Sequence, residues 1–135
     1  RQRQMCIRDR ISPVPFKDIS KAAPGEPSAR IRERVIRARE IQAERFKDFK
    51  GIHCNAQMTE RMIHQFAEPT EEGINLLRMA MEKLSLSARA YNRILKVART
   101  IADLAGSQQI EPQHLAEAIG YRTLDRGDWA ERGHF

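Results

Sequence analysis

The stretch SARAYNRILKVARTIADLAGSQQIEPQHLAEAIGYRTLDR, residues 87–126, decides the fold predicted for this chain. Ser87 is a favourable N-cap, and small or apolar side chains then recur at helical spacing up to about Ala105. Gly106 is placed as the residue after the helix end, and Pro112 suits the first position of another helix. The stretch therefore predicts two consecutive helices with a short connection.

Each of these two helices has one apolar face. The first is expected to bury Ala90, Tyr91, Ile94, Val97, Ala98, Ile101 and Ala105. The second places Leu115, Ala118 and Ile119 together. Aromatic residues make up only 6% of the chain, so aliphatic and alanine side chains must supply the core. That composition suits packed helices better than a sheet.

Three more helices are predicted upstream. A long helix opens at Ser28 and runs to about Asp48, a short one follows Thr59 and is ended by Pro69, and Thr70 caps a third. The apolar face of the long helix is expected to carry Ile31, Val35, Ala38, Phe46 and Phe49. No alternating strand pattern is present. The predicted fold class is therefore all-α, a bundle of about five helices.

The bundle is predicted to occupy residues 28–126, and the sequence on either side differs from it. Residues 1–11 are basic and without helical periodicity, and are expected to be a non-native or disordered leader. Residues 12–27 are rich in proline and are expected to form an extended segment leading into the bundle. Residues 127–135 are expected to be a flexible tail.

Length, charge and cysteine content narrow the class of protein. A chain of 135 residues suits one modest helical domain, and a net charge of +6 favours an anionic partner. No stretch approaches the ~20 apolar residues that cross a bilayer, so no membrane role is expected. Cys6 and Cys54 stand outside any metal-ligand or disulfide pattern, so no metal site is predicted and a cytoplasmic location is expected.

Three basic residues, Arg89, Arg93 and Lys96, are predicted to lie on one side of the helix after Ser87, beginning at its N-terminal end, where acidic residues are usual. If Ser87 is the N-cap, Arg89 is the second helical residue, where the helix dipole disfavours a cation by roughly 0.3–1 kcal/mol at exposed sites. Arg93 and Lys96 follow at i+4 and i+7 on the same exposed side. Free backbone N–H groups at this end would welcome a phosphate, which would explain the arginine. The alternative interpretation is a solvated basic face.

Several uncommon strings in series resemble one known family. Residues 87–126, with VPFKDIS at 14–20, SARIRERVIRARE at 28–40 and CNAQM at 54–58, are similar in order to the C-terminal lid domain of the magnesium-chelatase-like AAA+ ATPases, of the type named after YifB and ComM. The resemblance covers about residues 12–126. One departure is Ser85, which stands where that family usually has glycine.

The resemblance implies a function that spacing alone does not. The complete protein would be a cytoplasmic ATPase that uses ATP and Mg²⁺, assembles as a homo-oligomer such as a hexamer, and acts on DNA in branch migration and natural transformation. Its lid would pack on an upstream AAA+ core and supply Arg89 as the sensor-2 arginine at the γ-phosphate. The chain itself has no GxxxxGK[ST] motif, so it would bind no cofactor and be inactive alone.

Two other functions remain open at this stage. The chain could be a stand-alone basic helical module that binds nucleic acid, or an oligomerisation domain without a ligand. The lid function is favoured because the basic row begins at a capped helix end and is not interleaved with aromatic residues.

Overall fold

A computed structural model describes residues 13–123, which fall into two compact units divided between Ile31 and Arg32. The leader predicted over residues 1–11 and the tail predicted over 127–135 lie outside the described residues. In the first unit, the segment predicted to be extended contains a short helix, α2 (Phe16–Ser20). Its first turn closes because the N–H of Asp18 donates to the carbonyl of Pro15, at 2.9 Å.

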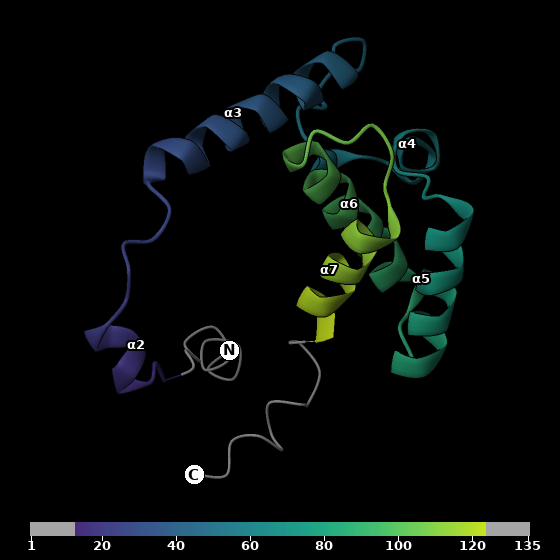
Figure 1. The fold of residues 1–135 in the computed structure, drawn as a ribbon. Coiled ribbons are helices and arrows are strands. Elements are labelled where there is room, and N and C mark those ends of the chain that lie inside the picture. The colour runs from purple at the N-terminus through teal and green to yellow at the C-terminus, as the bar shows by residue number, and fades with distance from the viewer. Residues whose placement is uncertain (1–12, 124–135) are drawn as a thin grey trace, which may run out of the picture. The chain divides into compact units, whose positions relative to one another are not determined.

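The second unit is built from helices, as the sequence predicted. After α3 (Ser28–Arg45), which begins in the first unit, come the 3-10 turn η1 and four helices, coloured from teal to yellow in Figure 1. They are η1 (Asn55–Gln57), α4 (Glu60–Phe66), α5 (Glu71–Leu84), α6 (Ala88–Leu104) and α7 (Pro112–Thr123). Residues 13–123 contain no strand beyond an isolated bridge between Pro69 and Ile110. The all-α class is confirmed.

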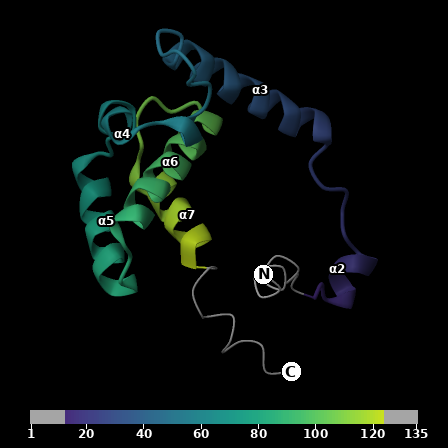
Figure 2. The same ribbon diagram turned by 180° about the vertical axis from the view of Figure 1, so that it is seen from behind.

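Helix α6 is the centre of the second unit. It packs against α7, α4 and η1, while α7 also packs on α5, an arrangement visible from both sides in Figures 1 and 2. The core is aliphatic, with Leu77, Ile94, Ile110 and Leu115 among its most deeply buried side chains. At one end the rings of Phe46, Phe49 and Phe66 meet edge to face, the geometry that aromatic quadrupoles prefer.

The caps predicted at Ser87 and Thr70 are confirmed, and Thr59 caps the short helix that was predicted to follow it. The hydroxyl of Ser87 accepts a hydrogen bond from the N–H of Ala90 at 3.2 Å, and Thr59 and Thr70 cap α4 and α5 in the same way. Gly106 follows α6 with a positive φ of 70°, where only glycine is free of steric cost. These local signals fix where the helices start and end, and hence which residue begins α6.

Two predicted apolar faces are partly wrong. Helix α3 ends at Arg45 and buries only Ala38 and Gln42, while Ile31 and Val35 are 43% and 39% exposed. On α6, Val97 is 41% exposed and Ala105 is also exposed. The buried side of α6 instead includes Leu95, Arg99, Ala102 and Asp103. The spacing argument assigned only apolar side chains to the buried face. Helix α6 also buries the ion pair between Arg99 and Asp103, so its buried face includes charged residues.

The family departure at Ser85 coincides with a strained backbone position. Ser85 caps the C-terminus of α5 in the left-handed conformation, with φ 50° and ψ 48°, the conformation that glycine adopts most easily. We expect Ser85→Gly to raise the free energy of unfolding by about 0.5–1 kcal/mol, because the steric cost of Cβ is removed. Urea unfolding followed by circular dichroism would measure it, and a loss of stability would contradict the expectation.

Candidate functional site

Arg89 lies where the sequence placed it. Ala88 is the first residue of α6 and Arg89 the second, and the side chain of Arg89 is exposed. No acidic residue lies in the first turn of α6, and within residues 13–123 no carboxylate forms an ion pair with Arg89. Among the described residues, the positive end of the helix dipole therefore lies beside a guanidinium that has no carboxylate partner.

Arg93 and Lys96 have different surroundings from Arg89. Both line an open groove between α6 and α7, and Arg89 is not among the lining residues. Arg93 is exposed, whereas Lys96 is half-buried and its Nζ donates to the backbone carbonyl of Ala56 at 3.1 Å. The three cations predicted as one anion-binding surface thus divide into a helix-end residue and two groove residues.

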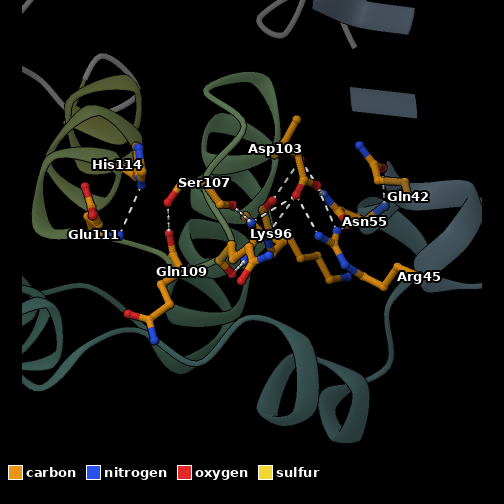
Figure 3. A network of polar contacts seen from close by, with 12 residues as sticks. Gln42, Arg45, Asn55, Lys96, Asp103, Ser107, Gln109, Glu111 and His114 are labelled. Atoms are coloured by element: carbon orange, nitrogen blue, oxygen red, sulfur yellow. Dashed lines mark hydrogen bonds and ion pairs between the residues drawn. The ribbon is translucent and has the colours of Figure 1, made fainter. Parts of the chain in front are cut away.

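A polar network at the opposite end of α6 was not predicted. Figure 3 shows Asp103 at its centre, where the carboxylate accepts hydrogen bonds from Arg45, Arg99 and Asn55. The Arg45 guanidinium makes a bidentate contact with the Asp103 carboxylate, with Nη1 at 2.8 Å from Oδ2 and Nη2 at 2.6 Å from Oδ1. The Asp103 side chain has no exposed surface. Paired guanidinium contacts of this kind are strong and directional.

The other groups of the network tie four chain segments together. The Arg99 guanidinium donates to the carbonyls of Ser107 and Gln108 in the connection that leads to α7. The N–H of Asn55 in η1 donates to the side-chain carbonyl of Gln42 in α3, at 2.9 Å. Among the described residues, no buried side-chain nitrogen or oxygen lacks a hydrogen bond. The network therefore fixes the end of α3, η1 and the α6–α7 connection on one helix.

Charge in the network is unbalanced, with two guanidinium groups sharing one carboxylate. Burial lowers the pKa of Arg99 below its ordinary value, and the charge of Asp103 opposes that effect. Because an arginine begins with a very high pKa, the group remains charged near neutral pH. Asp103 thus supplies the counter-charge that the buried, permanently charged Arg99 requires, and shares it with Arg45.

Sequence signals for this network were weak. Arg99 and Asp103 stand at i,i+4 on α6, a spacing that favours an ion pair but gives no sign that the pair is buried. Arg45 and Asp103 are 58 residues apart, and no local pattern connects them. Asn55 lies within the family-like string at 54–58, without any indication of its partner.

Histidine and acidic residues form no other candidate centre in the part of the chain that the structure describes. Between residues 13 and 123, no group of three or more histidine, cysteine, aspartate and glutamate side chains is arranged to hold a metal ion. His114 is buried, and its Nδ1 accepts a hydrogen bond from the N–H of Glu111 at the start of α7. Over the same residues, no helix has the length and apolar content to cross a membrane.

Comparison with known sequences assigns these helices to a domain of the magnesium chelatase type. Residues 25–122 match the family described as magnesium chelatase, subunit ChlI C-terminal, and the chain belongs to this family. It is 48% identical over 102 residues to competence protein ComM of Haemophilus influenzae, a match that covers 76% of this chain and 19% of that protein. It is 44% identical over 103 residues to protein YifB of Escherichia coli, covering 76% and 19% respectively. The chain thus spans about a fifth of the length of these relatives.

Proposed function

We propose that this domain is the lid of a AAA+ ATPase and that Arg89 contacts the γ-phosphate of a nucleotide bound by a separate core. The observation that carries the proposal is an exposed guanidinium at the second position of a capped helix, without an ion-pair partner within residues 13–123. Family membership supports it, because the match includes all of α6 and begins before α3.

The physical argument concerns the balance of charge at the start of α6. An arginine there opposes the helix dipole, and the structure supplies no carboxylate within residues 13–123 to offset that repulsion. A phosphate would accept hydrogen bonds from the guanidinium and from the free N–H groups of the first turn together. As charge develops on the phosphoryl oxygens in the transition state, a pre-positioned arginine stabilises it.

The network at Asp103 supports the proposed role by giving α6 a fixed base. Arg89 and Asp103 are fourteen residues apart, about 21 Å along a helix that rises ~1.5 Å per residue. Arg45, at the end of α3, binds Asp103, so a displacement of α3 would be transmitted to α6 as a rigid body. That arrangement suits a lid whose closure brings Arg89 to the nucleotide.

The wider function follows from the same proposal. The lid would require an upstream core that binds ATP and Mg²⁺, and assembly into a homo-oligomer, such as a hexamer, would arrange several cores together. The relative in Haemophilus influenzae is named a competence protein. We therefore propose that the complete motor acts on DNA in the cytoplasm, in branch migration during natural transformation.

The test replaces Arg89 in the full-length ATPase that carries this domain. Arg89→Ala is expected to lower kcat for ATP hydrolysis by about 10²–10³-fold, the usual effect of removing one transition-state donor. Arg78→Ala, on the exposed side of α5, is the matched control and should leave kcat within about twofold. Both variants should unfold like the parent, because both side chains are exposed.

Unchanged ATP hydrolysis in Arg89→Ala would contradict the proposed role. The competing function, a stand-alone nucleic-acid-binding module, draws on the exposed basic residues of α3, namely Arg30, Arg32, Arg37 and Arg39. Tight DNA binding by the 135-residue chain alone, with an affinity that falls steeply as salt rises, would favour that module over the lid.

A further inference from the structure

A groove lies between α6 and α7, and the proposed contact of Arg89 with a phosphate does not involve it. It has a volume of about 670 Å³, and Ala56, the middle residue of η1, forms part of its wall. A space of this size is within the range of pockets that hold a ligand or a few docked side chains. Its floor is aliphatic, formed by Ile94, Val97, Ile101 and Ala118.

The groove combines this apolar floor with positive charge along α6. Arg93 is exposed, and within residues 13–123 neither Arg93 nor Lys96 forms an ion pair with a carboxylate. On the α7 side, Tyr121 also lines the groove, but its hydroxyl donates to Glu117 at 2.6 Å. That hydrogen bond raises the pKa of Tyr121. Cations therefore lie along the α6 side of the groove, and a hydrogen-bonded tyrosine lies on the α7 side.

We infer that this groove docks an acidic amphipathic segment of a protein, with aliphatic side chains on the groove floor and aspartate or glutamate facing Arg93 and Lys96. Val97, which is 41% exposed in the middle of α6, is the main apolar contact available to such a segment. An amphipathic helix laid in an apolar groove is a common recognition mode, and matching charges at the rim set its register and direction.

Single-stranded nucleic acid fits the same surface less well. Grooves that bind it pair cations with a series of aromatic rings on which bases stack, whereas this groove has one aromatic residue, Tyr121, and five aliphatic ones. The aliphatic lining therefore favours a protein segment over a nucleic acid.

The experiment selects helical peptides from a displayed random library against the 135-residue chain and measures their affinity by fluorescence anisotropy. We expect the recovered peptides to carry Leu, Ile or Met at i, i+3 or i+4, with Asp or Glu beside them. Arg93→Glu and Val97→Gln should each weaken their binding by at least tenfold. Arg78→Glu on α5 reverses an exposed charge outside the groove and is expected to leave affinity within twofold. Circular dichroism would verify that each variant is folded.

The inference would be overturned by recovery of no binder, by recovery of basic peptides, or by peptides whose affinity is the same for Arg93→Glu and the parent. Displacement of the peptides by a fifteen-nucleotide oligo-dT at low micromolar concentration would show that the groove binds nucleic acid instead. Arg89→Ala should leave peptide affinity unchanged, because Arg89 does not line the groove. Failure of the groove inference and failure of the proposed phosphate role can therefore be told apart.

Discussion

Asp103→Asn is expected to lower the free energy of unfolding by about 3–5 kcal/mol, the usual cost of breaking a buried ion pair from one side. The substitution keeps the shape of the side chain but removes its charge. The side chains of Arg45 and Arg99 are only 12% and 4% exposed, so both cations would stay largely buried without a counter-ion. The new amide NH₂ is a donor, and it would face guanidinium N–H groups that now donate to the Asp103 carboxylate, so donor would meet donor.

Urea unfolding followed by helical circular dichroism measures this effect directly. Asp48→Asn is the matched control, because Asp48 is exposed in the turn after α3, and its change should lie within about 0.5 kcal/mol. Since small domains are stable by only about 5–15 kcal/mol, Asp103→Asn could leave the chain partly unfolded without denaturant, which would agree with the prediction. A loss below about 1 kcal/mol would show that the network is not a main support of the fold.

Leu115→Ala is expected to cost about 2–5 kcal/mol, as other leucine deletions in packed cores do. Leu115 is completely buried in α7 and faces α5, where Gly73 leaves room for it. A methyl group added at Gly73 would lie 2.7 Å from Cδ1 of Leu115 and 3.1 Å from Cβ of Pro69. Thermal and urea unfolding of the variant would test how much of the α5–α7 contact depends on this side chain.

A double-mutant cycle with Gly73→Ala identifies the mechanism. Alone, Gly73→Ala should destabilise, because the clash with Leu115 costs ~1–3 kcal/mol against a gain of up to ~1 kcal/mol in helix propensity. With Leu115→Ala present, much of that clash is absent, so Gly73→Ala should be at least ~1 kcal/mol less unfavourable. Effects that add within about 0.3 kcal/mol would mean that the two residues do not share the space.

Much of the helical framework could be predicted because its signals are local. Ser87, Thr59 and Thr70 cap helices, since a hydroxyl in that position meets a free N–H three residues on. Pro112 begins α7 as predicted. The same local chemistry placed Arg89 at the start of α6. Its contact with a phosphate remains a prediction, because that contact would involve a partner outside this chain.

Burial was harder to predict than helix boundaries. Hydrophobic spacing assigned Val97 to the core and left out Asp103, yet Val97 is 41% exposed and Asp103 is 2% exposed. A charged side chain is buried only where the fold brings a partner of opposite charge to it. The partner here, Arg45, lies on another helix 58 positions earlier in the chain. Arg93 and Lys96 were likewise grouped with Arg89 by spacing, whereas α7 makes them part of a groove.

The amino-acid sequence by itself determined the helical class, the caps and the identity of the residue at the start of α6, because each depends on hydrogen bonds and side-chain spacing within a few residues. Only the tertiary structure decided that Arg45, Arg99 and Asn55 converge on Asp103, and that α7 turns one side of α6 into a groove. These arrangements require segments far apart in the chain to meet, and the free energy of such contacts is set by packing and desolvation that no local pattern records.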